Sequence, residues 1–303
     1  MASRRAAARP RAVTIVADIG AAYAAQMVGV LATRAPSVRV LTVVADLPRQ
    51  DVRSSAWILR SIAERFPPGT IHVCVVDPGV GTSRAPIAIE CAGGTVLVGP
   101  DNGVLGPTAD RLGMRRAVRL DRARVGATPI GSTFDGRDLF APAAALLARG
   151  RPIAALGPTI RPRPGSLGAA IRTRGGARAS VAYIDPFGNA VTNVPSDWIP
   201  RSVRSVDVRG GRLRDRAGPL VASYEALGPG GWGLLRSSFG SIEIAVDRGS
   251  AADRYRLASG SPVELRWVPG PVTPRGRGVA RARPVRGPPP HRLRPRGSTR
   301  SGG

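Results

Sequence analysis

Three aspartates follow predicted strands and stand in or beside glycine-rich turns. Asp18 follows the apolar run 13–17, Asp77 begins the segment DPGVGT, and Asp101 begins the segment DNG. Ligands of open parallel sheets bind beyond the carboxyl ends of the strands, where a carboxylate can accept hydrogen bonds or take a proton. A single Asp–Gly turn is usually only a turn. Three of them near one sheet edge indicate a candidate ligand site, with ordinary turns as the alternative.

Two further segments concentrate polar side chains. Residues 132–142 read STFDGRDLFAP and place Asp135 and Asp138 before a predicted helix. The simpler interpretation is a helix start with Asp138 near its N-terminus, where a negative charge is stabilising.

The second segment, residues 183–193, reads YIDPFGNAVTN. Asp185 and Asn189 flank a turn, and Phe187 offers an aromatic face for stacking. The simpler interpretation is a tight hairpin with Asn189 at positive φ.

Several classes of site are excluded by residue type. The chain has no lysine for a phosphate-binding loop, and clustered carboxylates repel phosphate. Two cysteines exclude a disulfide scaffold and a four-cysteine zinc site, and two histidines exclude a three-histidine metal centre. We therefore expect no metal and no cofactor.

The elements that position these residues alternate between strands and helices. Continuous apolar strands separated by helices predict a largely parallel sheet covered on both faces. The predicted strands are 13–17, 38–44, 71–76, 87–89 and 95–98, and the predicted helices are 23–34, 51–66 and 142–148.

The pattern changes after Gly150, so a second domain is expected. Residues 151–178 are rich in Arg, Pro and Gly and predict a connection. Short alternating runs at 181–184, 205–208, 241–246 and 262–267 predict a small all-β domain. The predicted organisation is an α/β domain over 12–160 and a β-domain over 179–268.

The charge of the chain is strongly positive, and its ends carry much of the excess. All 45 basic residues are arginine and the formal net charge is +25, with nine arginines in 269–303 and four in 1–11. We expect both ends to be disordered basic tails that bind no specific nucleic acid. The arginines are otherwise spread, as coding bias would produce, and aromatics are 4%, few for base stacking.

No apolar run is long enough to span a membrane, so no membrane partner is expected. Arg4 and Arg5 precede a short apolar stretch that Asp18 interrupts too early for an export signal. We therefore predict a cytoplasmic protein with reduced cysteines.

Six segments in order resemble the S-adenosylmethionine hydrolase family, the S-adenosyl-L-methionine hydroxide adenosyltransferases, which are relatives of the fluorinating and chlorinating enzymes. The resemblance covers roughly residues 13–267 and implies an N-terminal α/β domain and a C-terminal barrel-like β-domain. It also implies a homotrimer with the small-molecule substrate bound between neighbouring subunits. The segments are 13–20, 77–84, 100–103, 132–142, 183–193 and 237–246.

The resemblance implies hydrolysis of adenosylmethionine to adenosine and methionine by water attacking the ribose C5′. Asp77 and Arg84 match the family's acid and guanidinium, which would orient and deprotonate that water. Asp18 matches the ribose-binding aspartate. The remaining matches to substrate-binding positions lie in the predicted β-domain: Asp185, Phe187, Asn189, Ser238 and Glu243.

The chain departs from the family at one catalytic position. The family's segment is STFHGRD, and this chain has Asp135 in place of the histidine, with Ala17 and Ile19 replacing Thr and Phe beside Asp18. We expect an extra negative charge beside a single Arg84. Asp135 would then serve as a base, and the alternative is an impaired enzyme.

Three other functions remain open at this point, one of which is a basic nucleic-acid binder that acts through the tail 269–303. A halogenase would use chloride or fluoride in place of water, but a carboxylate such as Asp77 repels a halide. A non-catalytic protein would bind adenosylmethionine or adenosine without turnover.

Overall fold

The computed structural model describes residues 12–267. The predicted tails 1–11 and 269–303 lie outside the described residues. Among residues 12–267, no helix is long and apolar enough to cross a membrane.

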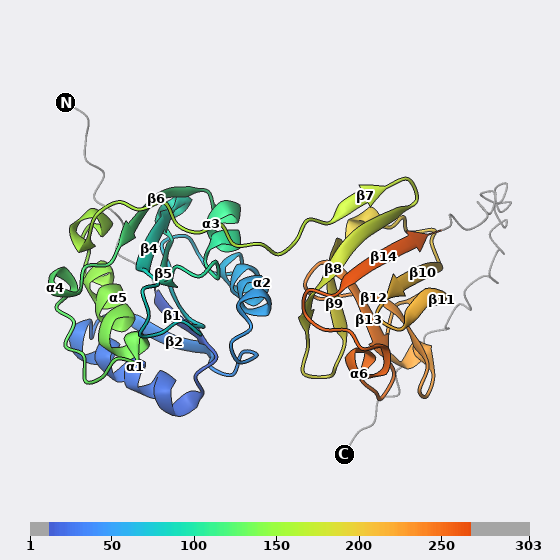
Figure 1. Cartoon of the computed structure of the whole chain (residues 1–303), viewed down its shortest axis with the longest axis horizontal. Helices are drawn as coiled ribbons and strands as arrows, with labels where there is room; N and C mark the ends of the chain where they lie inside the picture. The colour runs from blue at the N-terminus through green and yellow to red at the C-terminus, as the bar shows by residue number, and fades with distance from the viewer. Residues whose placement is uncertain (1–11, 268–303) are drawn as a thin grey trace, which may run out of the picture. The chain divides into compact units, whose positions relative to one another are not determined.

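The N-terminal domain is built on a six-stranded sheet in the order β2-β1-β3-β5-β4-β6 (Figure 1). β4 is antiparallel to both of its neighbours, and the other strands share one direction. The prediction of a mostly parallel sheet is therefore confirmed. The strands are β1 (Ala12–Ala17), β2 (Arg39–Val44), β3 (Ile71–Val75), β4 (Pro86–Cys91), β5 (Val96–Pro100) and β6 (Met114–Arg119).

Helices cover both faces of this sheet. Ile71, Val73 and Val75 of β3 pack in one core cluster with residues of α1 (Ala21–Arg34) and α5 (Ala141–Ala148). Cys74 of β3 packs in the other cluster with residues of α2 (Val52–Ala63) and α3 (Gly106–Leu112). Side chains of a strand alternate between faces, so one strand serves both clusters. The short α4 (Arg122–Val125) follows β6, and a π-helical turn, η2 (Gly136–Phe140), leads into α5.

The C-terminal domain is a closed β-barrel, which confirms the predicted barrel-like fold. Its ring runs β14-β10-β11-β12-β13-β9-β8, and β14 pairs with β8 to close it. β7 extends β8 outside the ring. The strands are β7 (Ile171–Thr173), β8 (Gly176–Ile184), β9 (Ala190–Pro195), β10 (Ser205–Gly210), β11 (Leu213–Val221), β12 (Trp232–Arg236), β13 (Ser241–Val246) and β14 (Pro262–Trp267). A one-turn helix, α6 (Ala251–Tyr255), precedes β14.

Candidate active site

Asp77 and Arg84 face each other across the loop between β3 and β4. Arg84 Nε donates to both carboxylate oxygens of Asp77, at 3.0 and 2.8 Å, and Arg84 Nη2 donates to Asp77 Oδ2 at 2.5 Å. Gly81 makes the loop possible, because its φ is +79° and a Cβ there would lie 3.1 Å from the carbonyl oxygen of Ser132. The glycine-rich segment thus brings a carboxylate and a guanidinium, seven positions apart in sequence, into contact.

Asp135 joins this pair from the residue preceding η2. Arg84 Nη2 donates to Asp135 Oδ2 at 2.5 Å. The three side chains are nearly buried, with 8% of Arg84 and 6% of each aspartate exposed. The Arg84 guanidinium carbon also lies 5.5 Å from the centre of the Phe140 ring. The three residues predicted as catalytic therefore form one contiguous cluster.

Arg122, a residue that the sequence analysis missed, completes the cluster. Its Nη2 donates to Asp135 Oδ1 at 2.7 Å. The expected extra negative charge beside a single arginine is therefore wrong, because two carboxylates meet two guanidiniums. We name Asp77, Arg84, Asp135 and Arg122 the four-charge cluster.

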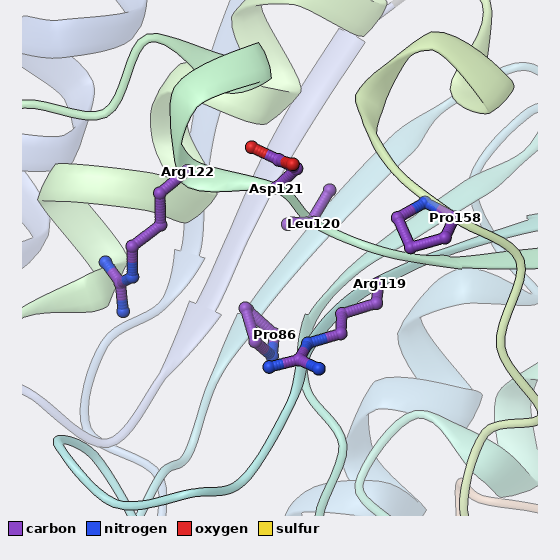
Figure 2. A pocket seen from close by; sticks show the side chains of 6 residues that line it. All are labelled: Pro86, Arg119, Leu120, Asp121, Arg122 and Pro158. Carbon is purple, nitrogen blue, oxygen red and sulfur yellow. The ribbon is translucent and has the colours of Figure 1, made fainter.

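Arg122 also borders a second hollow, shown in Figure 2. Its side chain extends from the start of α4, while the carboxylate of Asp121 points the other way in this view. Arg122 is the one member of the four-charge cluster among the residues that line this hollow. The hollow has a volume of about 340 Å³ and is lined by Pro86, Arg119, Leu120, Asp121, Arg122 and Pro158.

Charge also sets the protonation state of Arg84. Burial alone would lower the pKa of this guanidinium, but its hydrogen bonds and charge interactions with Asp77 and Asp135 outweigh burial and raise that pKa. Arg84 therefore stays cationic in the site.

A cavity of about 170 Å³ adjoins the cluster and is lined by Asp18, Asp77 and Asp135. Asp18 Oδ2 accepts a hydrogen bond from the backbone N–H of Gln50 at 2.7 Å, which fixes its carboxylate at the end of β1. Arg84 Nη1 donates to none of the described residues, whereas Nε and Nη2 both donate to carboxylates. A volume of this size holds a few water molecules.

Asp101 does not take part in this site. Its carboxylate is buried and accepts a hydrogen bond from the backbone N–H of Arg163 at 2.7 Å. The third acid-ended strand is therefore only a structural turn. Asp138, in the first turn of η2, is likewise occupied, since it pairs with Arg137 at 2.7 Å and accepts from the Ile130 N–H.

The second group of predicted residues lies in the C-terminal domain, in the turn between β8 and β9. Asp185 Oδ1 accepts from the backbone N–H groups of Phe187 and Asn189, both at 2.9 Å, and Asp185 Oδ2 accepts from the Asn189 amide at 2.9 Å. Phe187 is 79% exposed, so its ring is free to stack. The expected positive φ at Asn189 is wrong, because Gly188 carries it at +81°.

Glu243, on β13, is buried and near this turn. Burial raises the pKa of its carboxyl; a hydrogen bond from Tyr224 lowers it, and the charge of Asp185 raises it again, for a raised pKa overall. Tyr224 O–H donates to Glu243 Oε1 at 2.5 Å. Burial, Glu243 and Asp185 all raise the pKa of Tyr224 as well, so the phenol remains a donor.

Ser238 stands apart from these contacts. It is exposed in the turn between β12 and β13, and its side chain has no hydrogen-bond partner among residues 12–267. Its neighbour Phe239 packs against Tyr183, with ring centroids 6.1 Å apart.

These features define a class of two-domain proteins in which a mostly parallel α/β domain with a buried carboxylate–guanidinium cluster precedes a closed β-barrel. The SAM hydroxide adenosyltransferase N-terminal domain matches residues 13–157, and the C-terminal domain of the same family matches residues 179–264. The chain belongs to the SAM hydroxide adenosyltransferase family.

Individual relatives agree with this assignment. A Salinispora arenicola protein named (R)-S-adenosyl-L-methionine hydrolase is 36% identical over 267 residues, covering 84% of this chain and 97% of the relative. An uncharacterized conserved protein from Thermotoga maritima has a crystal structure that matches with a TM-score of 0.75 at 28% identity, covering 84% of this chain and 99% of that chain. A fluorinase from Actinoplanes is a more distant relative, at 21% identity over 292 residues, covering 84% of this chain and 96% of the fluorinase.

Proposed function

We propose that the protein hydrolyses S-adenosyl-L-methionine to adenosine and L-methionine. The observation that carries this proposal is the contact of Asp77, Arg84 and Asp135 beside a cavity that Asp18 also lines. The family and the name of the Salinispora relative support the substrate.

The chemistry needs an activated water and little else. A bond forms between the water oxygen and the ribose C5′ while the C5′–sulfur bond breaks. The sulfur leaves as a neutral thioether and needs no proton. The difficult part is the nucleophile, because water is weakly nucleophilic at neutral pH, and a positioned base and cation are what it requires.

Asp77 is the proposed base. Its Oδ1 accepts one hydrogen bond from Arg84, and a carboxylate oxygen can accept two, so it keeps room for the proton of a water. The unshared Nη1 of Arg84 is the proposed donor to the developing hydroxide. Asp135, which occupies the family's histidine position, holds Arg84 Nη2 in place, and Nη1 keeps no partner among the described residues.

The binding roles are proposed from the resemblance and from exposure. The Asp18 carboxylate is proposed to accept hydrogen bonds from the ribose hydroxyls. The exposed Phe187 ring is proposed to stack on the substrate. The remaining proposed contacts to the methionine or adenine end are Asp185, Asn189, Ser238 and Glu243.

We further propose a homotrimer that acts in the cytoplasm without a cofactor. Cys74 and Cys91 are both buried and unpaired, in keeping with a reducing compartment. Light scattering of the purified protein tests the assembly, and a mass other than three chains would contradict it.

The central test is incubation with each sulfonium epimer of adenosylmethionine, followed by chromatography for adenosine and methionine. We expect both products, and we expect Asp77→Asn to lower kcat by about 100-fold or more while adenosine still binds. Asp110→Asn, which changes an exposed acid on α3, is the matched control and should not affect kcat.

The same assay separates the two alternatives that bind adenosylmethionine. Adenosine binding by calorimetry without any product would identify a non-catalytic binding protein. A 5′-halo-adenosine formed on adding chloride or fluoride would identify a halogenase. We expect no 5′-halo-adenosine, because three carboxylates line the cavity and repel a halide anion.

A further inference from the structure

We propose that Arg122 is a positioning residue that holds Asp135 against Arg84 and so lets an aspartate occupy the family's histidine position. This inference rests on the proposed function. It assigns Arg122 a role in aligning Arg84 without contact to the substrate.

The hydrogen bonds of Asp135 support this role. One carboxylate oxygen accepts from Arg84 at 2.5 Å and the other accepts from Arg122 at 2.7 Å. Asp135 therefore lies clamped between two guanidiniums. A carboxylate held on both sides cannot rotate without breaking one charge-assisted hydrogen bond.

The negative charge of Asp135 explains why the second guanidinium is needed. A neutral histidine beside Asp77 and Arg84 would leave the site balanced, whereas Asp135 adds a negative charge that is almost fully buried. A buried charge without a partner is strongly unfavourable. Arg122 restores the balance of the four-charge cluster.

Arg122 reaches Asp135 from outside the cavity that holds the proposed water. Its side chain is 49% exposed, and it lines a separate hollow of about 410 Å³ with Gly81, Thr82 and Asp135. Asp135 lines both this hollow and the inner cavity. Replacing Arg122 therefore substitutes no residue that lines the inner cavity and acts there only through Asp135.

The neighbouring acid Asp138 faces the same arginine. Burial raises the pKa of Asp138, but hydrogen bonds from Arg137 and the Ile130 N–H, the charge of Arg137 and last that of Arg122 lower it overall. Asp138 has its own partner in Arg137, at 2.7 Å. Arg122 is thus the second cation of Asp135, and Asp138 does not compete for it.

A double-mutant cycle tests the proposal. The variants are Arg122→Gln, Asp135→His and the double variant, with Arg122→Lys as the conservative replacement. Arg124→Gln is the matched control, because Arg124 lies on the same helix and, among residues 12–267, pairs only with the exposed Asp121, at 3.8 Å. The measurements are kcat, KM, calorimetric adenosine affinity and the midpoint of thermal unfolding.

We expect Arg122→Gln to lower kcat by about tenfold while KM changes by less than about twofold. Arg122→Lys should recover most of the loss. In the Asp135→His background the same Arg122→Gln change should alter kcat by less than about twofold, because histidine needs no second cation. Arg124→Gln should match the unmodified protein.

An equal loss of kcat in both backgrounds, or no loss in either, would overturn the role of Arg122. If the unmodified protein releases no adenosine, the proposed function fails, and the cycle is then read from adenosine affinity and the unfolding midpoint. Non-additive effects of the two substitutions on these quantities would support the coupling, and additive effects would overturn it.

Discussion

At the scale of single residues, buried carboxylates have different partners in the two groups of candidate site residues. Asp77 and Asp135 are each paired with a guanidinium. Glu243 receives its hydrogen bond from a phenol instead. Burial raises the pKa of Glu243, and the phenol, which brings no positive charge, lowers it only in part.

Tyr224→Phe is predicted to make substrate binding fail at a higher pH. The phenol bond lowers the pKa of Glu243, so its removal raises that pKa further, and binding that uses the ionised carboxylate is then lost earlier as pH falls. KM measured from pH 5 to 8 checks this. Tyr255→Phe is the control, since the Tyr255 hydroxyl has no hydrogen-bond partner among the described residues. An acid limb that does not move would contradict the prediction.

The sequence predicted the acids of the N-terminal site and the arginine within their own segment. It did not predict Arg122, because nothing in its surroundings distinguishes it from the other arginines among the 45 in the chain. Gln50 and Tyr224 were missed for a related reason, since their contacts join segments far apart in sequence. Residue type therefore indicates the carboxylates of a site more readily than the side chains and backbone groups that hydrogen-bond them.

At the scale of elements, the loop between β3 and β4 decides whether Arg84 meets Asp77. The loop passes close to residue 132 at Gly81, where a Cβ would lie 3.1 Å from the carbonyl oxygen of Ser132. The loop requires a positive φ at this position and leaves no room for a side chain, and glycine meets both conditions.

Gly81→Ala is therefore predicted to lower both stability and activity. We expect a loss of about 1–2 kcal/mol in the free energy of unfolding from positive φ and contact together, and a clear fall in kcat as the loop shifts. Gly150→Ala is the control, because Gly150 also has a positive φ but open space around it. Denaturant unfolding and adenosine release measure the two effects, and equal kcat values for the two variants would count against the prediction.

Several strands were predicted and others were missed, among them the buried strands β9 and β12 and two exposed strands rich in arginine. The predicted strands 241–246 and 262–267 match β13 and β14. β6 and β11 were missed, because their sequences MRRAVR and LRDRAGPLV place arginines on largely exposed positions. Exposed strand residues carry no hydrophobic signal, and β6 is recognisable only once it is paired with β4.

At the scale of the whole molecule, His72 links stability to pH. It lies fully buried in β3, where Thr14 Oγ1 is 2.8 Å from its Nδ1. Burial lowers the pKa of His72 to about 4. The unfolded chain binds a proton near pH 6.5 whereas the folded chain does not, so folding is weakened as pH falls below 6.5.

We predict that His72 removes about 3 kcal/mol of stability between pH 6.5 and pH 4. His72→Gln should show a shallower fall over that range, because glutamine does not titrate. The free energy of unfolding from denaturant titrations at pH 4 to 8 measures the difference. Parallel curves for the two proteins would rule out His72 as the cause.

The pairing of β14 with β8 has a consequence for how the barrel is assembled. Residues 262–266 pair with residues 176–180. The last strand of the ring therefore pairs with the first, although the two are separated by almost the whole sequence of the domain. Contacts between such distant segments form slowly during folding. Until β14 arrives, β8 and β10 each present an unpaired edge, which is the kind of surface through which separate chains aggregate.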